Sequence, residues 1–336
     1  LSTNWQATLA QVLAEKQGHT VIICHQNPDG DALGSSLGLR HWLASHGLSA
    51  TVLSPNRLPF FLQWLPGYQG IVDAEEAPEQ AQALIQQAST IFALDFGTTG
   101  RMAQLEEAVL ASSARRLNVD HHLDHERFTD AWFREVKASS TAELVYRLIQ
   151  QEGSTLPPDA ATCLYTGIVT DTGSFHHNVN PSVFRVVADL LEAGLDLPYV
   201  NHHLHNTNRE ARIRFMGFML HERLEILPQL KTALLPASQD DILRYELFPG
   251  DTEGIVNMGL SIDGVQLAIF LREQDGKVRM SFRSEGSFPA NEVAQHFGGG
   301  GHRNAAGARQ EAPLQEVLQE LHRVLPSFHQ HLTPQA

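Results

Sequence analysis

The segment HQNPDGD, residues 25–31, places one imidazole and two carboxylates within seven residues. Asn, Pro and Gly are turn formers, so an ordinary surface turn is one interpretation of the segment. Imidazole and carboxylate groups are also metal ligands, so a metal site is the other interpretation. Other segments of the chain are needed to distinguish a surface turn from a metal site.

Three further segments carry acids or histidines immediately after an apolar run: Asp95 after TIFAL, Asp120, His121 and His122 after RRLNV, and Asp171 after TGIVT. Open parallel sheets bind ligands beyond the carboxyl ends of their strands, where segments distant in sequence converge. Taken singly, a residue such as Asp95 is typical of a helix N-cap or a turn. Together, carboxylates and imidazoles without a thiolate favour Mn²⁺ or Mg²⁺, with Fe²⁺ and Co²⁺ as alternatives, over structural zinc. Two ions ~3.5–4 Å apart could share one carboxylate.

Predicted strands and helices alternate through the first half of the chain. Apolar runs predict strands at 20–24, 49–55, 90–95 and 115–122, and helical periodicity predicts helices at 32–47 and 74–88. Ser140 and Glu143 have the spacing of a capping box, which predicts a helix start there. A buried helix is expected to end near Asp171. This alternation favours an α/β fold with a mostly parallel sheet flanked by helices.

The second half of the chain changes character. Residues 182–225 are helical in pattern, and strand-like runs follow at 230–236, 264–273 and 277–284 before a final helix at 314–325. The expected organisation is a metal-binding domain over 1–185, a helical connector over 186–225 and a second, smaller α/β domain over 226–336.

Charge and composition limit the classes of partner that the chain is expected to bind. The net charge is −14, with 24 Lys plus Arg against 38 Asp plus Glu, which disfavours a long duplex nucleic acid gripped along its length. The smaller domain is locally basic, because between residues 272 and 309 six basic residues outnumber four acidic ones. No apolar run has the length of a membrane span, no signal-peptide pattern is visible, and Cys24 and Cys163 lie in apolar segments. A cytoplasmic protein with reduced thiols and no membrane partner is expected.

The motifs HQNPDGDALGSS, ALDFG, VDHH and TGIVTDTGSF resemble the four motifs of the DHH phosphoesterase superfamily. The run GGGGHRNAAGA resembles the glycine-rich substrate motif of the DHH-associated domain. These motifs extend from residue 25 to residue 307. Within the superfamily, the two-domain form is similar to the NrnA-type group of nanoRNases and 3'-phosphoadenosine 5'-phosphate phosphatases.

The resemblance implies two divalent cations, Mn²⁺ with Mg²⁺ as the alternative. One ion is expected to bind His25, Asp29 and Asp95, and the other Asp31, Asp95, His121 and Asp171, with Asp95 shared. Gly30 is expected to leave room for the carboxylates on either side of it. Asp120 is expected to orient a histidine or a bound water. His122 is expected to contact phosphate or donate a proton, with a purely structural histidine as the alternative.

The resemblance also implies a phosphate-binding region in the second domain. Successive glycine amides can turn towards a phosphate without obstruction by a Cβ atom, and an adjacent histidine adds a donor. The residues expected to bind substrate are Arg283, Gly300, Gly301, His302, Arg303 and Asn304.

The activity implied is hydrolysis of short oligoribonucleotides to mononucleotides, or of 3'-phosphoadenosine 5'-phosphate to AMP. Three alternatives stay open: a dedicated phosphodiesterase for linear dinucleotides, a manganese pyrophosphatase and a non-catalytic nucleotide-binding regulator. The expected partner is therefore a short RNA or a nucleotide, and a homodimer is compatible with the sequence.

Overall fold

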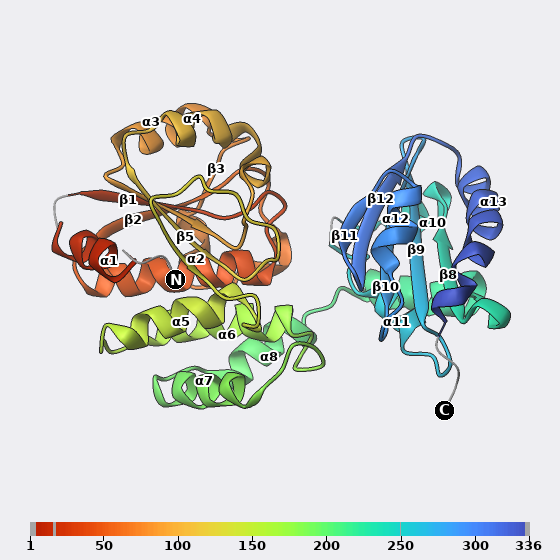
Figure 1. The fold of residues 1–336 in the computed structure, drawn as a ribbon. Coiled ribbons are helices and arrows are strands. Elements are labelled where there is room, and N and C mark those ends of the chain that lie inside the picture. The colour runs from red at the N-terminus through yellow and green to blue at the C-terminus, as the bar shows by residue number, and fades with distance from the viewer. Residues whose placement is uncertain (1–4, 16–17, 249, 333–336) are drawn as a thin grey trace. The chain divides into compact units, whose positions relative to one another are not determined.

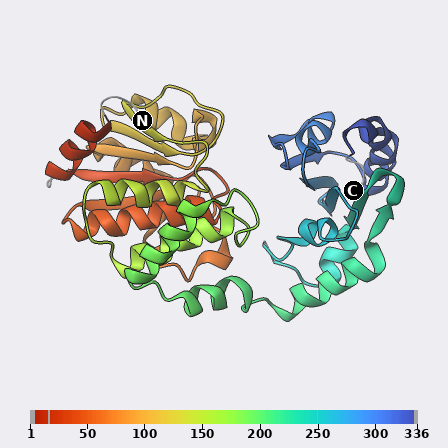
Figure 2. The same cartoon turned by 60° about the horizontal axis from the view of Figure 1, so that its bottom comes forward.

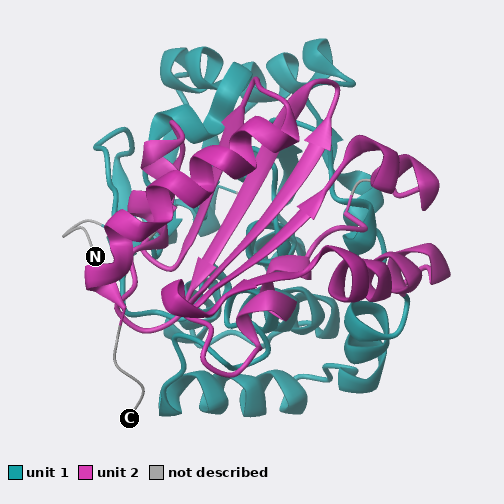
Figure 3. Ribbon diagram, turned by 90° about the vertical axis from the view of Figure 1, so that its right-hand side faces the viewer, with its two compact units in different colours: residues 1–207 teal, residues 208–336 magenta. Residues whose placement is uncertain are grey.

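The structure is a computed structural model that describes residues 5–15, 18–248 and 250–332, apart from the side chain of His302. The chain divides into two compact units, residues 1–207 and 208–336 (Figure 3). The boundary falls inside the segment 186–225 that the sequence marks as a connector. Within that segment α7 (Pro181–Glu192) and α8 (Leu197–His205) belong to the first unit, and α9 (Glu210–Phe218) belongs to the second.

Unit 1 is built on a six-stranded parallel sheet in the order β3-β2-β1-β4-β5-β6 (Figure 1). Its strands are β1 (His19–Ile23), β2 (Ser49–Ser54), β3 (Val72–Asp73), β4 (Thr90–Leu94), β5 (Arg115–Asp120) and β6 (Ala131–Arg134). The predicted parallel sheet is confirmed. Strands β3 and β6 have two and four residues, too few for a recognisable sequence pattern.

Helices cover both faces of this sheet, because alternate residues of each strand point to opposite sides. On β1, Ile22 packs in a core with the helices on one face, whereas Val21 and Ile23 join the core on the other face. The first face carries α1 (Trp5–Ala14), α2 (Gly30–Ser45), α5 (Thr141–Gln151) and α6 (Pro158–Asp171). Helices α7 and α8 add to that side (Figure 2). The second face carries α3 (Pro78–Gln87) and α4 (Glu106–Ala111).

The strand order places a topological switch point between β1 and β4. The chain runs outward from β1 through β2 to β3 and then returns to the other side of β1 to form β4. The loops that leave β1 and β4 therefore diverge and leave a crevice beyond the strand ends, which is where open α/β sheets bind ligands. His25 and Asp95 lie on these two loops.

Unit 2 holds a second six-stranded sheet in the order β11-β12-β10-β9-β8-β7. Its strands are β7 (Glu225–Leu227), β8 (Thr232–Ala237), β9 (Leu267–Gln274), β10 (Lys277–Ser284), β11 (Gly300–His302) and β12 (Ala305–Gln310). The β8–β9 pair is parallel and the other pairs are antiparallel. The glycine-rich run, predicted as a phosphate-binding turn, contributes the short hairpin β11–β12 at one edge.

Helices also lie on both faces of the second sheet. One core is closed by α12 (Ala290–His296) and α13 (Leu314–Val324), and the other by α9 and α11 (Ile255–Leu260), with α10 (Gln239–Arg244) beside it. The predicted smaller α/β unit is confirmed. None of the described helices is long and apolar enough to cross a membrane.

Candidate metal centre

His25 opens the site at the end of β1. Its side chain is almost fully buried, and its Nδ1 lies 2.8 Å from the carbonyl oxygen of Gln26. This contact turns Nε2 towards two carboxylates, 3.8 Å from Asp29 Oδ2 and 3.5 Å from Asp95 Oδ2. Asp29 is the N-cap of α2, and its Oδ1 accepts hydrogen bonds from the backbone N–H groups of Asp31 and Ala32. Asp29 therefore serves as an N-cap and still presents Oδ2 to the histidine.

The Asp31 carboxylate is buried against the beginning of α5. Its Oδ2 accepts a hydrogen bond from the N–H of Thr141 at 2.7 Å, and its Oδ1 accepts one from the N–H of Ala142 at 2.9 Å. The first N–H groups of a helix have no partner within the helix, and a carboxylate there is also favoured by the helix dipole. Asp31 thus satisfies the start of a helix 110 residues away in sequence.

The start of α5 differs slightly from the predicted capping box. Ser140 Oγ accepts a hydrogen bond from the N–H of Glu143 as expected. The Glu143 carboxylate, however, accepts its hydrogen bond from the N–H of Ser139, at 2.7 Å. The return bond therefore reaches one residue further than the motif requires, and the predicted helix start is nevertheless confirmed.

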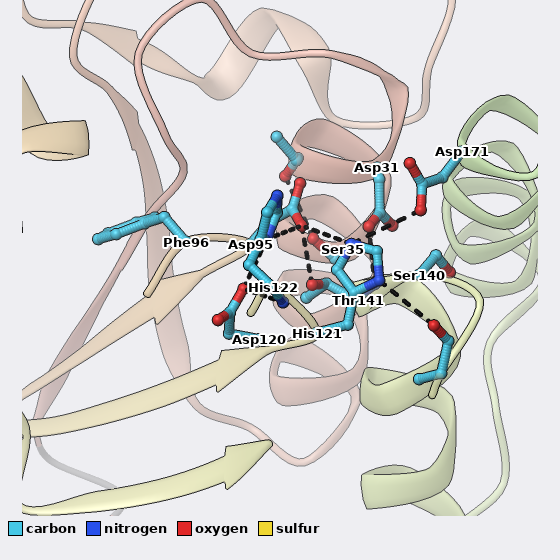
Figure 4. A network of polar contacts seen from close by, with 12 residues as sticks. Asp31, Ser35, Asp95, Phe96, Asp120, His121, His122, Ser140, Thr141 and Asp171 are labelled. Carbon is cyan, nitrogen blue, oxygen red and sulfur yellow. Dashed lines mark hydrogen bonds and ion pairs between the residues drawn. The ribbon is translucent and has the colours of Figure 1, made fainter. Parts of the chain in front are cut away.

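Asp95 lies at the centre of the cluster, directly after β4. It is 2% exposed and has a left-handed backbone conformation with a φ of 67°, a rare state that is often found at functional sites. Its Oδ1 accepts a hydrogen bond from the Thr141 hydroxyl at 2.9 Å and lies 3.7 Å from His121 Nε2. Its Oδ2 faces His25. The two oxygens of one carboxylate thus face two different groups of potential ligands (Figure 4).

The segment from Asp120 to His122 joins from the end of β5. Asp120 is fully buried, and its Oδ1 lies 2.8 Å from His122 Nδ1. Because a carboxylate only accepts hydrogen bonds, this contact places a hydrogen on His122 Nδ1. His121 turns the other way, with Nδ1 against the carbonyl oxygen of Ala138 and Nε2 3.6 Å from Asp171 Oδ2. Asp171 is the last residue of α6, as the sequence predicts.

The donor atoms form compact groups suited to a metal ion. His25, Asp29 and Asp95 form one group, and Asp31, His121 and Asp171 form a second. Asp95 with His121 and His122 forms a third group, so the geometry also allows His122 as a ligand. The buried Oδ2 of Asp171 accepts no hydrogen bond from any described residue, which leaves it available to a cation. Carboxylates with imidazoles are a donor set typical of Mn²⁺ and Mg²⁺ sites, so these residues fit a divalent metal.

The pKa values of the residues in the cluster also favour a divalent cation at this site. Burial, with the charges of Asp95 and Asp171, raises the pKa of Asp31 well above its ordinary value, and burial raises the pKa of Asp171 to about 7. Burial lowers the pKa of His25, but the neighbouring carboxylates of Asp29 and Asp95 raise it to about 10. The raised pKa values of Asp31 and Asp171 reflect burial and repulsion between neighbouring carboxylates. A divalent cation would relieve the same repulsion between carboxylates.

Gly30 lies where α2 packs against α6. A Cβ atom on Gly30 would lie 2.2 Å from the hydroxyl oxygen of Thr170 on α6. Its expected role between the carboxylates of Asp29 and Asp31 stays a prediction. The glycine is required because α2 and α6 approach closely at this point. It therefore places Asp31 of α2 near Asp171 of α6.

The residues expected to bind substrate lie in unit 2. Arg283 is on β10, Gly300 and Gly301 are on β11, and Arg303 and Asn304 form the turn before β12, while the side chain of His302 is outside the described part. Arg303 donates to the carbonyl oxygen of Ser287, and Asn304 donates to that of Ser284. Burial lowers the pKa of Arg283. The structure therefore places these residues together at one end of the sheet, and their binding roles stay predictions.

Two contributors to the site are absent from the sequence-based set. Thr141 holds Asp31 and Asp95 together, and Arg134 of β6 donates to the carbonyl oxygens of His122 and Leu123. Arg134 Nε also lies 3.6 Å from Asp120 Oδ2. Neither residue belongs to a motif that contains a ligand, so only the fold reveals them.

Comparison with known proteins agrees with this geometry. The model described as "DHH family, N-terminal domain" matches residues 19–168, and the model described as "DHHA1 domain" matches residues 241–327. A relative from Thermus thermophilus, named bifunctional oligoribonuclease and PAP phosphatase NrnA, is 32% identical over 97% of this chain and 94% of its own length. This chain belongs to the DHH family.

Other similar proteins extend the comparison. The bifunctional oligoribonuclease and PAP phosphatase NrnA of Bacillus subtilis is 24% identical over 86% of this chain and 89% of its own length. The solved structure of an exopolyphosphatase-related protein from Bacteroides fragilis is 35% identical, covers 98% of both chains and has a TM-score of 0.93. RecJ of Thermus thermophilus, solved in complex with Mn²⁺, has a TM-score of 0.51 at 13% identity over 97% of this chain and 54% of its own, and so shares the fold alone.

Proposed function

We propose that this DHH-family chain is a metal-dependent phosphoesterase that hydrolyses short oligoribonucleotides to mononucleotides and dephosphorylates 3'-phosphoadenosine 5'-phosphate to AMP. The observation that carries the proposal is the position of Asp95. Its Oδ2 lies 3.5 Å from His25 Nε2 and its Oδ1 lies 3.7 Å from His121 Nε2, at the switch point of a parallel sheet. One carboxylate thus lies between two sets of proposed metal ligands, an arrangement that suits a two-metal hydrolytic site.

The proposed ligands are His25, Asp29 and Asp95 for one divalent cation, and Asp31, Asp95, His121 and Asp171 for the other. Two such cations, Mn²⁺ or Mg²⁺, would supply the concentrated positive charge that stabilises a phosphoryl transition state and promotes ionisation of water. The chain contributes the arrangement of the ligands. Asp29 is fixed as an N-cap, Asp31 by two N–H groups of α5, and Asp95 by the Thr141 hydroxyl.

His122 is proposed to donate a proton to the phosphate or to the leaving oxygen. Burial lowers its pKa, but the hydrogen bond to Asp120 and the charge of Asp95 raise it above its ordinary value. The protonated ring, which is a donor at both nitrogens, is therefore favoured. Asp120 fixes the orientation of the ring through the 2.8 Å contact with Nδ1.

The preference for short substrates is supported by charge and by the relatives. The chain carries a net charge of −14, which opposes long-range attraction of a long polyanion. Two relatives of similar length, from Thermus thermophilus and Bacillus subtilis, are named bifunctional oligoribonuclease and PAP phosphatase. Arg283 and the glycine-rich hairpin of unit 2 are proposed to bind a phosphate or base of the substrate.

Product analysis with Mn²⁺ tests this function. The substrates are a 5'-phosphorylated RNA dinucleotide, an RNA chain of many nucleotides, 3'-phosphoadenosine 5'-phosphate and pyrophosphate, with Asp95→Asn as the inactive control. Rapid turnover of the dinucleotide and slow turnover of the long RNA are expected. Turnover of pyrophosphate alone would show that the metal centre hydrolyses phosphoric anhydrides and that the substrate is misassigned.

A dedicated phosphodiesterase for linear dinucleotides is the second candidate. It is favoured by the similarity to the cyclic-di-AMP phosphodiesterase GdpP of Bacillus subtilis, which is 25% identical over 95% of this chain and 49% of its own length. This candidate predicts turnover of linear pApA or pGpG without turnover of 3'-phosphoadenosine 5'-phosphate. The same panel of substrates, extended by these dinucleotides, separates the two activities.

A further inference from the structure

Three arginines stand side by side across the sheet of unit 2. In the strand register, Arg279 of β10 is directly opposite Arg272 of β9 on one side and Arg309 of β12 on the other. Directly opposite residues of antiparallel strands point to the same face, with Cβ atoms roughly 5 Å apart. The three side chains, called here the arginine row, therefore project together from one face of the sheet.

The same face continues along β10 to Arg283. The side chains of β10 alternate between the two faces of the sheet. One face carries Lys277, Arg279, Ser281 and Arg283. The other carries the buried residues Val278, Met280 and Phe282, which pack in the core under α12 and α13. Arg283 is four positions after Arg279, which corresponds to roughly 13 Å along the strand. Between them the face is low on the β12 side, where Ser281 is opposite Gly307, whereas on the β9 side Ser281 is opposite Phe270. An extended ligand that contacts Arg283 could therefore continue along β10 to the arginine row.

The arginine row lacks acidic partners. Among the described residues, no ion pair joins Arg272, Arg279 or Arg309 to a carboxylate, whereas the nearby Lys277 pairs with Glu311 at 2.7 Å. Arg272 donates to the side-chain oxygens of Thr252 and Gln274, which are neutral. Glu253 acts on Arg272 and Arg283 only through its charge and forms a hydrogen bond with neither.

This arrangement is unfavourable for the isolated unit. Burial and the charge of Arg279 both lower the pKa of Arg272, so the guanidinium groups repel one another. Like charges placed directly opposite on neighbouring strands destabilise a sheet. The chain as a whole has an excess of acids, yet among the described residues Glu253 and Glu311 act on the row only through their charges and form no ion pair with it. A row of unpaired cations in an acidic protein is best explained by an anionic ligand.

We infer that the arginine row binds backbone phosphates of a single-stranded oligoribonucleotide beyond the nucleotides held near Arg283. The inference rests on the proposed function for the choice of RNA as the ligand. Three adjacent guanidinium groups on a low, extended face suit several phosphates along one strand better than they suit a single compact anion. The row would thus extend binding from dinucleotides to oligonucleotides of a few residues.

Metal-free binding measurements test the inference without requiring hydrolysis. The full-length chain is kept in EDTA, and its affinity for a fluorescein-labelled oligoadenylate pentanucleotide is followed by fluorescence anisotropy over a series of NaCl concentrations. The variant is Arg279→Ala with Arg309→Ala. The matched control is Arg214→Ala with Arg323→Ala, which removes the same charge from exposed arginines that already pair with Glu210 and Glu320.

The row variant is expected to bind the pentanucleotide about tenfold more weakly and to reduce the slope of log affinity against log salt by about 1.4, since each phosphate contact on a single strand contributes about 0.7. The control pair is expected to bind as the wild type does. Replacing the same two arginines by lysine keeps the charge and is expected to restore most of the slope.

Equal weakening in both double variants would mean a general effect of net charge and would overturn the inference, as would unchanged binding in the row variant. Competition by polyglutamate as strong as that by unlabelled RNA would instead assign the row to an acidic protein partner. Binding is measured without turnover. The affinity of the row variant can therefore be interpreted even if the chain does not hydrolyse oligoribonucleotides.

Discussion

The hydroxyl group of Thr141 donates a hydrogen bond to Asp95 Oδ1 at 2.9 Å, between two residues that are 46 positions apart in sequence. The backbone N–H of Thr141 donates to Asp31 at the same time. One fully buried residue at the start of α5 therefore orients two carboxylates that are proposed to hold different cations. Such partners of metal ligands fix the orientation of the ligands and tune the affinity for the metal.

Replacing Thr141 with Val is expected to weaken Mn²⁺ binding by about tenfold, because the isosteric side chain fills the same space but leaves Asp95 Oδ1 without its donor. Calorimetric titration of the metal-free protein with Mn²⁺ measures this directly. Thr141→Ser keeps the hydroxyl and is expected to retain near-normal affinity. Wild-type affinity in the Val variant would show that this hydrogen bond does not orient the ligand.

Replacing Arg134 with Gln is expected to destabilise unit 1 by about 3 kcal/mol, because the fully buried Asp120 carboxylate loses its neighbouring cation. Urea denaturation measures the loss. The control is Arg115→Gln, since Arg115 of β5 pairs with the exposed Glu15 and its removal is expected to cost less than about 1 kcal/mol. Equal losses in the two variants would contradict the role of Arg134 beside Asp120.

The roles of the two adjacent histidines are separable by metal content. His121→Ala is expected to lose one Mn²⁺ per chain, because Nε2 of His121 belongs to the proposed second ligand set. His122→Ala is expected to keep both ions and to lose about 100-fold in kcat, the scale of general acid catalysis. Elemental analysis with steady-state kinetics distinguishes them. Loss of a metal in the His122 variant would make His122 a ligand, which the third donor group also allows.

The close approach of α2 and α6 predicts an effect on stability. A Cβ atom at Gly34 would lie 2.5 Å from the carbonyl oxygen of Cys163 and 2.7 Å from the backbone nitrogen of Gly167. Gly34→Ala is therefore expected to cost about 3 kcal/mol by overpacking. Gly217→Ala, in α9 with open space around it, is expected to stabilise by about 0.5 kcal/mol. Thermal or urea unfolding measures both, and a neutral Gly34→Ala would show that the helices can separate.

Much of unit 1 is predictable from sequence because its signals are local. The buried strands β1, β2, β4 and β5 are short apolar runs, and each is found at the predicted place within a few residues. Acids and histidines follow such runs, and open parallel sheets bind ligands at the switch point. Together these two facts predict from the sequence that His25 and Asp95 lie at one crevice. The family predicted from the motifs is confirmed by the match over residues 19–168.

What the sequence does not reveal depends on contacts between distant segments. The sequence identifies Asp31 only as an acid in the first turn of α2. The fold shows that its carboxylate also accepts hydrogen bonds from N–H groups at the start of α5. Thr141 follows a recognisable N-cap, but nothing near it in sequence predicts a hydrogen bond to Asp95. Arg134 lies on a four-residue strand without a detectable pattern. The alignment of Arg272, Arg279 and Arg309 likewise requires the strand register.

The central claim is that Asp95 is shared by two cations at the ends of β1 and β4. Anomalous diffraction from a crystal soaked in Mn²⁺, recorded at the manganese edge, tests it most directly. Two peaks are expected to flank the Asp95 carboxylate, one beside His25 and Asp29 and one beside Asp31, His121 and Asp171. A single peak, or a pair of peaks that does not share Asp95, would contradict it.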